Sequence, residues 1–190
     1  MMRSIMMLVL GLNVVTSFSS KIPKFSVRST SNNLKMTSSF YDIVEKDANG
    51  EAVKFDKFKG KVLYGVNVAS KCGYTASGYA LLSKVSKIPG VEVALFPCNQ
   101  FLGQEPGSDA DVANFCVLKG VEGPNVNVFT KGDVNGANTR PTYKFLKDKG
   151  VLGNVKWNFA GKFIVDKEGN VLQINSDQDV EPTITKLTAK

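Results

Sequence analysis

The stretch "KVLYGVNVASKCGYT", Lys61 to Thr75, carries the strongest indications of how this chain folds. Its first part, "KVLYGVNVA", is apolar and rich in β-branched side chains, a pattern typical of a central strand buried on both faces. Cys72 follows shortly after Ala69, and a glycine comes next. Because the chain contains no histidine, a thiol at the end of a strand needs an explanation that does not involve an imidazole partner.

The segments around this strand alternate between strand-like and helix-like patterns. "VEVALF", Val91 to Phe96, predicts a second buried strand that Pro97 ends. Ser108, with Asp111 three residues later, forms an acidic capping box at the start of a helix. Helices are predicted for Tyr79 to Val85, Asp109 to Leu118, Pro141 to Asp148 and Glu181 to Lys190, and β-hairpins for Phe40 to Glu45 with Ala52 to Phe55 and for Lys162 to Val165 with Val171 to Ile174. This order predicts an α/β fold, a mixed central β-sheet flanked by helices with an N-terminal β-hairpin.

The net charge of +7 is not spread evenly along the 190 residues. Residues 1 to 41 contain five basic residues and no acidic residue, which leaves +2 for the remainder. The remainder also lacks a run of Lys and Arg interleaved with aromatic residues, the pattern of a nucleic-acid-binding surface. We therefore expect no nucleic-acid partner.

The N-terminal segment has the composition of a targeting sequence. Ile5 to Val15 is an apolar stretch of signal-peptide length, and the segment after it is rich in Ser, Lys and Arg and free of acids, as in an organelle transit peptide. We expect residues 1–38 to be a signal and transit segment for import into a plastid through the secretory pathway, and residues 39–190 to form the folded domain. A secretory signal followed by a linker, leading to the endoplasmic reticulum or another organelle, is the alternative.

Three cysteines, Cys72, Cys98 and Cys116, are too few and too widely spaced for a disulfide framework or a zinc site. Without histidine, Cys-His and Ser-His-Asp hydrolases and His-ligated metal enzymes are excluded as ordinary mechanisms. We expect neither a metal nor a cofactor.

Cys72 is placed where α/β proteins keep their sites, at the carboxyl edge of a strand and before a helix. The free N–H groups and the dipole of a helix N-terminus favour a thiolate there, and the Lys71 ammonium adds to this if it lies near. A small buried hydrophobe is the alternative role of such a cysteine. A thiolate that needs hydrogen-bond donors but no imidazole suits attack on a peroxide O–O bond, which gives a sulfenic acid that a second thiol can trap.

Three blocks, "NVASKCGYT", "FPCNQFLGQEPGS" and "VKWNF", resemble in this order the signature motifs of the glutathione peroxidase family. The similarity continues through "DVNGANTRPTYKFLK" and "KFIVDKEGNV" and covers residues 40 to 187. The resemblance implies a thioredoxin-like fold and a peroxidase that acts as an antioxidant in the oxidative stress response. It departs from the common family pattern at "WNFAGKFIV", where one additional residue, Gly161, predicts a bulge at the start of the strand.

The resemblance also implies roles for single residues. Cys72 matches the peroxidatic position, and Gln104, Trp157 and Asn158 match the other members of the catalytic tetrad. Their amide and indole N–H groups are donors that would stabilise a thiolate and orient a peroxide. Cys116 matches the resolving cysteine of the non-selenium, thioredoxin-dependent members, whose disulfide with Cys72 would require the Cys116 helix to loosen.

We expect Cys98, at the end of a strand, to be structural. The resemblance implies hydrogen peroxide and organic or lipid hydroperoxides as substrates, thioredoxin or else glutathione as reductant, a monomeric state and transient contact with a membrane surface. Two alternatives remain: a peroxide sensor that relays oxidation to a client protein, and a noncatalytic thioredoxin-fold binding module.

Overall fold

The structure, a computed structural model, describes residues 39–189. The predicted targeting segment, residues 1–38, lies outside these described residues. The strands are β1 (Val44–Lys46), β2 (Ala52–Lys54), β3 (Val62–Val68), β4 (Val91–Pro97), β5 (Val126–Val128), β6 (Lys162–Val165) and β7 (Val171–Ile174). The α-helices are α1 (Thr75–Val85), α2 (Asp109–Leu118), α3 (Pro141–Asp148) and α4 (Val180–Thr188), and short 3₁₀ helices are η1 (Phe40–Asp42), η2 (Phe55–Phe58) and η3 (Asp177–Asp179).

Five of the strands form one mixed sheet in the order β5-β4-β3-β6-β7. β3 pairs in parallel with β4 and antiparallel with β6, so that β3 lies at the centre. The parallel register runs from Val62 opposite Val91 to Val68 opposite Pro97. Because both strands end at the same edge, the segments that carry Cys72 and Cys98 leave the sheet side by side.

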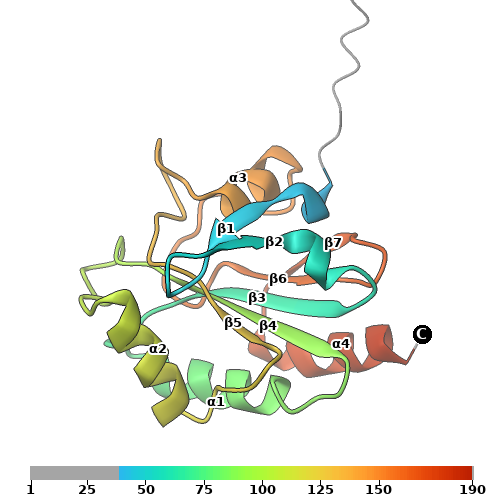
Figure 1. Ribbon diagram of the computed structural model, residues 1–190, viewed down its shortest axis with the longest axis horizontal. Helices are drawn as coiled ribbons and strands as arrows, with labels where there is room; N and C mark the ends of the chain where they lie inside the picture. Colours follow the sequence, from blue (N-terminus) through green and yellow to red (C-terminus); the bar gives the residue numbers. More distant parts are fainter. Residues whose placement is uncertain (1–38, 190) are drawn as a thin grey trace, which may run out of the picture. The chain divides into compact units, whose positions relative to one another are not determined.

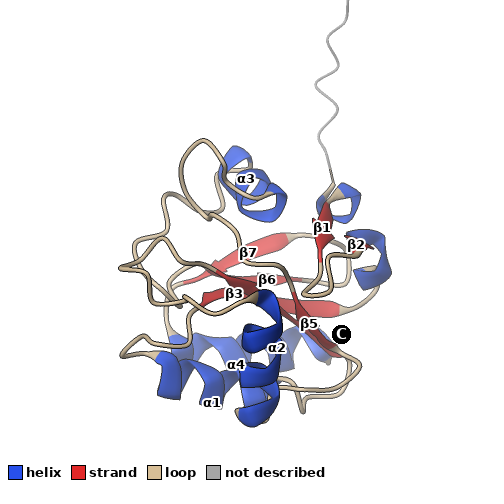
Figure 2. Ribbon diagram, turned by 60° about the vertical axis from the view of Figure 1, so that its left-hand side comes forward, coloured by secondary structure: helices blue, strands red, loops and turns tan. Residues whose placement is uncertain are grey.

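Helices cover both faces of the sheet. Figures 1 and 2 show α1, α2 and α4 on one face, and α3 with the β1–β2 hairpin on the other. A hydrophobic cluster lies on each face of the sheet, and alternate residues of β3 point into one or the other. Tyr64 and Val66 pack in the cluster on the side of α1 and α4, and Leu63 packs in the opposite cluster. This is the α/β arrangement with a mixed sheet and an N-terminal hairpin that the sequence predicts, and its topology is that of the thioredoxin-like fold.

A buried ion pair fastens the N-terminal hairpin to the α3 side of the sheet. The Arg140 Nε and Nη2 groups donate to the two carboxylate oxygens of Glu45 at 3.2 and 3.1 Å. The Thr142 backbone N–H and hydroxyl donate to the same carboxylate at 3.0 and 2.7 Å. The Arg140 guanidinium also lies over the Phe96 ring, 4.8 Å from its centroid. Because its charges are paired and hydrogen-bonded, this buried group of side chains is tolerated away from water.

The helices whose first residues carry a capping box or a proline match their predictions. α2 begins after Ser108, whose hydroxyl accepts from the Asp111 N–H while the Asp111 carboxylate accepts from the Ser108 N–H, which confirms the capping box. α3 has Pro141 at its first turn, as predicted. The predicted start of the first helix at Tyr79 is wrong, because α1 already begins at Thr75. The segment before Tyr79 has few apolar residues, so hydrophobic periodicity does not reveal that turn.

Two strands differ from the prediction. The predicted first strand from Phe40 to Glu45 is wrong at its start: Phe40–Asp42 is a 3₁₀ helix, and the strand comes after it. β5 (Val126–Val128) was not predicted, since three half-buried residues carry too little pattern. The bulge predicted at Gly161 stays a prediction, because the regular pairing of β6 with β7 begins only at the next residue, Lys162.

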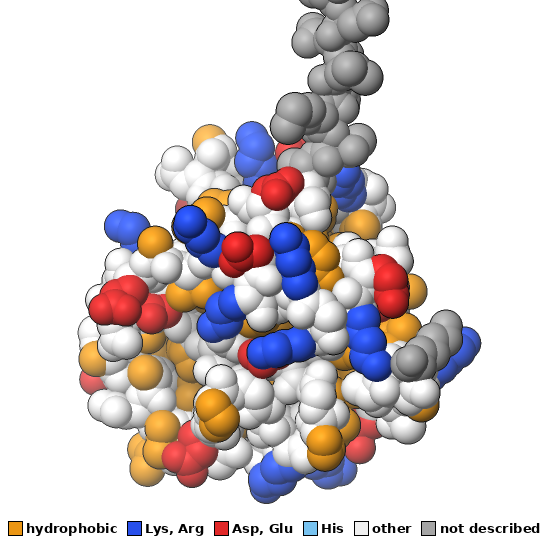
Figure 3. Space-filling view, turned by 45° about the vertical axis from the view of Figure 1, so that its right-hand side comes forward, with side chains coloured by type: hydrophobic (Ala, Val, Ile, Leu, Met, Phe, Trp, Pro, Cys, Tyr) orange, Lys and Arg blue, Asp and Glu red, His pale blue; other side chains and the backbone are white. Residues whose placement is uncertain are grey.

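Within residues 39–189, no helix is long and apolar enough to cross a bilayer. On the face drawn in Figure 3, lysine and arginine side chains are interspersed with aspartate and glutamate rather than gathered in one band. The charge on this face is therefore mixed.

Candidate active site

Cys72 lies in the turn between β3 and α1, and this turn is held by its own hydrogen bonds. The Thr75 hydroxyl donates to the Ala69 carbonyl at 2.8 Å and accepts from the Cys72 backbone N–H at 3.0 Å. The backbone N–H of Tyr74, the residue before the first turn of α1, points at the Cys72 sulfur from 3.5 Å. A backbone donor at a helix N-terminus can stabilise negative charge that develops on a nearby atom.

Gln104 and Asn158 meet beside this turn. The Lys71 backbone N–H donates to the Gln104 carbonyl at 3.0 Å, which fixes the loop of Gln104 next to the residue before Cys72. The Asn158 Nδ2 group donates to Gln104 Oε1 at 2.9 Å. Asn158 is buried, and its Oδ1 atom has no hydrogen-bond partner within residues 39–189. The two amides thus form a pair at the edge of the sheet where β3 ends.

Trp157 joins the same region from the loop before β6. Its backbone carbonyl accepts from the Asn67 side chain at 3.0 Å, and its ring lies 5.8 Å from the Phe101 ring, centroid to centroid. The indole packs against both hydrophobic clusters, one of which contains Cys72. The structure therefore gathers all four predicted tetrad residues, from three distant segments, at one edge of the sheet.

A cavity of about 290 Å³ opens on this region. Tyr74, Trp157 and Asn158 line it, together with the ion pair between Lys162 and Asp177, whose charged atoms are 2.9 Å apart. Its walls are partly apolar and partly polar.

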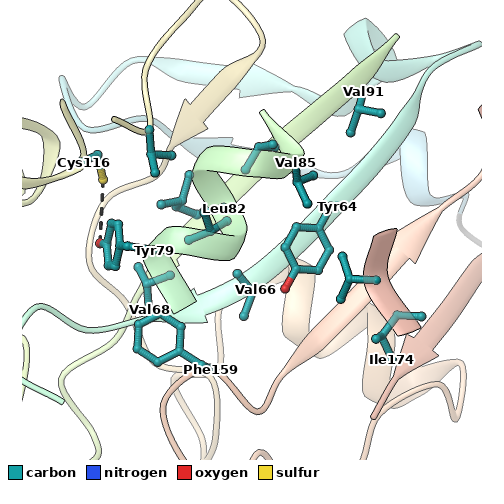
Figure 4. Close-up of a cluster of buried hydrophobic side chains, with 14 of the residues drawn as sticks. Tyr64, Val66, Val68, Tyr79, Leu82, Val85, Val91, Cys116, Phe159 and Ile174 are labelled. Atoms are coloured by element: carbon teal, nitrogen blue, oxygen red, sulfur yellow. Dashed lines mark hydrogen bonds between the residues drawn. The ribbon is translucent and has the colours of Figure 1, made fainter. Parts of the chain in front are cut away.

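Cys116 lies in the core, in the same hydrophobic cluster as Cys72. It is buried on α2, and its sulfur is 3.8 Å from the Tyr79 hydroxyl, the contact drawn in Figure 4. Burial raises the pKa of the Cys116 thiol to about 11, against a smaller opposing effect of the Tyr79 hydrogen bond, and the nearby Glu105 charge raises it further. The thiol is thus neutral near pH 7 in this conformation, and Cys72 and Cys116 are not joined.

Cys98 is buried at the end of β4 on the opposite side of the sheet. Its thiol donates to Gln100 Oε1 at 3.7 Å, and the same oxygen accepts from the backbone N–H groups of Val134 and Asn135. Burial raises the pKa of this thiol. These contacts agree with a structural position.

The chain matches the sequence profile of the family described as glutathione peroxidase over residues 40–147. The chain belongs to the glutathione peroxidase family. It is accordingly a peroxidase of that family, an enzyme class in keeping with a thiol at the mouth of a helix.

Three relatives show how close the match is. The chain is 48% identical to "Putative glutathione peroxidase 7, chloroplastic" of Arabidopsis thaliana over 162 residues, 80% of this chain and 68% of the relative. It is 50% identical over 141 residues to "Probable phospholipid hydroperoxide glutathione peroxidase" of Nicotiana sylvestris, 70% of this chain and 81% of the relative. It is 45% identical to "Glutathione peroxidase-like peroxiredoxin 2" of Saccharomyces cerevisiae over 166 residues, 80% of this chain and 100% of the relative.

A solved structure gives the same picture of the fold. The crystal structure of T. cruzi GPX1 aligns with a TM-score of 0.60 at 29% identity, covering 80% of this chain and 97% of that one. The peroxidase therefore shares the family's thioredoxin-like architecture.

Sequence reasoning missed one buried acid of this peroxidase. Glu105 follows Gln104, and both its carboxylate oxygens are buried without a hydrogen-bond partner of good geometry in the described residues. Desolvation raises the pKa of this carboxyl, while nearby Ser70 and Lys131 partly offset the effect. An acid between Gln104 and Pro106 gives no signal of burial, because loops are usually exposed.

A second residue was missed although the sequence carries a signal for it. Asn67 is a polar side chain inside the buried strand β3, and such a residue is unfavourable in a central strand unless its side chain has hydrogen-bond partners.

Within residues 39–189, no group of three His, Cys, Asp or Glu side chains is arranged to hold a metal ion.

Proposed function

We propose that this peroxidase is a two-cysteine thiol peroxidase in which Cys72 reduces the peroxide and Cys116 resolves the oxidised thiol. The Cys72 thiolate attacks one oxygen of ROOH, the O–O bond breaks, and the leaving alkoxide takes a proton to give ROH, which leaves Cys72 as a sulfenic acid. The observation that carries the proposal is the Tyr74 backbone N–H, whose nitrogen lies 3.5 Å from the Cys72 sulfur and which can stabilise negative charge at the reacting atom.

Gln104, Trp157 and Asn158 would supply the remaining donors to the sulfur and the peroxide. The Gln104 and Asn158 amides are fixed to each other at 2.9 Å, so neither has to be ordered when a peroxide arrives. Preorganised donors of this kind are worth most when they act without reorganisation in a site shielded from water. None of the three titrates near neutral pH, which suits a chain without histidine.

The second half of the cycle requires α2 to move. Cys116 attacks the sulfur of the Cys72 sulfenic acid, the S–O bond breaks, and water leaves with the Cys116 proton. A disulfide needs Cα atoms within about 7 Å of each other. In the reduced structure the Cys116 thiol is buried and neutral and contacts the Tyr79 hydroxyl, so we expect α2 to loosen before Cys116 can attack. Thioredoxin, a dithiol protein, would then reduce the disulfide by thiol–disulfide exchange.

Both hydrogen peroxide and lipid hydroperoxides fit the proposed site. The cavity of about 290 Å³ has partly apolar walls, and the name of the Nicotiana relative refers to phospholipid hydroperoxides. A monomer that touches a membrane surface transiently could reach such substrates.

The decisive experiment is peroxide turnover with thioredoxin and, separately, with glutathione, in wild type and in Cys72→Ser, Cys98→Ser and Cys116→Ser. We expect turnover with thioredoxin that Cys72→Ser and Cys116→Ser abolish and that Cys98→Ser leaves within about twofold. Loss of turnover in Cys98→Ser but not in Cys116→Ser would overturn the resolving role. Full turnover of Cys116→Ser with glutathione would make glutathione the reductant.

We also propose that residues 1–38 direct the enzyme to a plastid through the secretory pathway. The acid-free, Ser-rich composition of that segment supports this, as does the chloroplastic name of the Arabidopsis relative. A fluorescent fusion to residues 1–38 should appear in the plastid and lose the segment on arrival. Retention in the endoplasmic reticulum would contradict the proposal.

A further inference from the structure

Asn67 is the one polar side chain in β3, where all seven residues are buried. Its relative exposure is 0%. Its neighbours on the same face of the strand, Leu63 and Gly65, meet apolar groups of the α3 side. A buried amide in a central strand costs free energy unless its groups are hydrogen-bonded, so its partners indicate what it does.

All the hydrogen bonds of Asn67 outside the sheet go to the turn that carries Trp157 and Asn158. Its Nδ2 group donates to the Trp157 carbonyl at 3.0 Å, and its Oδ1 atom accepts from the Gly161 N–H at 2.7 Å. Its backbone carbonyl accepts from the Phe159 N–H at 2.8 Å. One strand residue therefore holds the turn 157–161 on both sides of Asn158.

The turn needs such support because its backbone is strained. Phe159 has φ of 62°, in the left-handed region that costs a non-glycine residue about 1–2 kcal/mol. Its ring fits against Gly78 of α1, where an added Cβ would come within 2.5 Å of the ring. A strained residue keeps its conformation only when its surroundings fix it.

Gly161, the residue additional to the common family pattern, is the last residue of the turn that Asn67 binds. A Cβ at this position would lie 2.8 Å from the Tyr143 ring and 3.0 Å from Asn67 Oδ1. Its carbonyl accepts from the Tyr143 hydroxyl at 2.8 Å. The absence of a side chain thus allows the backbone to reach the Asn67 amide.

We infer that Asn67 is a positioning residue: by binding the backbone of the turn 157–161 at three points, it aims the Trp157 indole and the Asn158 amide at the Cys72 sulfur. It touches neither the sulfur nor the peroxide and acts only through the turn. The inference rests on the proposed function of Trp157 and Asn158, and it explains why a polar residue occupies the centre of the sheet.

The test uses the fact that Trp157 is the only tryptophan of the chain. Asn67→Ala removes both side-chain hydrogen bonds, and Asn67→Thr keeps a residue suited to a strand but is too short to bridge the two contacts. We expect both variants to at least double the acrylamide quenching constant of Trp157. They should also lower the kcat/KM for peroxide tenfold or more, because small misplacements of reacting groups can cost about 100-fold in rate. The KM for thioredoxin should not change.

Asn125→Ala is the matched control. The Asn125 amide also donates to two backbone carbonyls, those of Ser86 and Val91, each at 2.9 Å, but it lies away from the turn. This variant should keep wild-type quenching and kcat/KM at a similar loss of thermal stability. If Asn67→Thr folds and keeps both quantities within twofold of wild type, or if Asn125→Ala changes them equally, the positioning role is overturned.

The two readouts separate this inference from the proposed function. If wild type reduces no peroxide, the proposed function fails, and the quenching of Trp157 in the Asn67 variants still decides whether Asn67 fixes the turn. If wild type is active and the quenching does not change, only the inference fails.

Discussion

At the scale of single residues, Cys72 and Cys116 sit in opposite surroundings. Cys72 receives a backbone N–H on its sulfur, whereas Cys116 is buried and its thiol has a pKa of about 11. Both thiols are buried, so the backbone N–H at the Cys72 sulfur is the difference on which the proposed order of the two steps rests.

Glu105 gives a pH-dependent prediction at this scale. Its pKa is raised in the folded state above the usual value of 4.5, chiefly by desolvation. The stability that its neutral form contributes is fully present below pH 4.5 and is lost as the pH rises through the raised folded pKa. Glu105→Gln, which stays neutral, should therefore raise the free energy of unfolding at pH 7, because it avoids the desolvation of a buried carboxylate.

Thermal unfolding of both proteins at pH 7 and pH 4 measures this effect. The gain in Tm at pH 7 should shrink toward zero at pH 4, where both side chains are neutral. Glu168→Gln, at an exposed turn, serves as the control and should change Tm little at either pH. A lower Tm of Glu105→Gln at pH 7 would mean that the carboxylate is favourably paired.

The arrangement of the four predicted site residues could be foreseen from the sequence only in part. Cys72, Gln104, Trp157 and Asn158 were found through motifs, and the donor at Cys72 through the expected helix N-terminus. The hydrogen bond between Gln104 and Asn158 was not foreseen, because it joins loops whose approach depends on the whole sheet. Local patterns report local geometry, and contacts between distant loops leave no periodic signal.

At the scale of elements, the proposed resolving step depends on α2, which carries the buried Cys116. Its start is fixed by the Ser108–Asp111 capping box and by Asp109, whose carboxylate accepts from the Lys131 N–H. The Lys131 ammonium also donates to the Glu105 carbonyl at 3.1 Å. The elements with such chemical end signals, α2 and α3, were predicted correctly, whereas β5 and the first turn of α1 lack them and were missed.

Weakening the cap of α2 should expose Cys116 more often. Ser108→Ala removes the capping hydroxyl, which costs the helix about 1 kcal/mol. A change of that size shifts the equilibrium between closed and open α2 roughly fivefold. The alkylation rate of Cys116 in the reduced protein should therefore rise roughly fivefold. Mass spectrometry of peptides labelled with iodoacetamide measures the rate for each cysteine.

The matched control for this prediction is Ser176→Ala. Ser176 caps the short helix η3 with the same kind of hydrogen bond, to the Gln178 N–H, and its loss should leave Cys116 labelling unchanged. An equal labelling rate in Ser108→Ala and wild type would show that Cys116 becomes accessible by a route other than opening of α2.

At the scale of the whole molecule, the Glu45–Arg140 pair connects parts of the chain that are far apart in sequence. Glu45→Ala leaves the Arg140 guanidinium buried without its carboxylate, and removal of one partner of a buried ion pair typically costs about 3–5 kcal/mol. Urea unfolding should show a loss of this size. Glu51→Ala, at an exposed position, should change the free energy of unfolding by less than about 0.5 kcal/mol. A loss below about 1 kcal/mol in Glu45→Ala would contradict the role of the pair.

The central position of β3 has a consequence for the newly made chain. Its antiparallel neighbour β6 is encoded about a hundred residues later, and contacts this distant in sequence form late because a long loop has to close first. A polypeptide that ends after its first two thirds lacks Trp157, Asn158 and β6. We therefore expect the proposed reactivity of Cys72 toward peroxide to arise only after these last segments have joined the sheet, so that a prematurely terminated product should react more slowly.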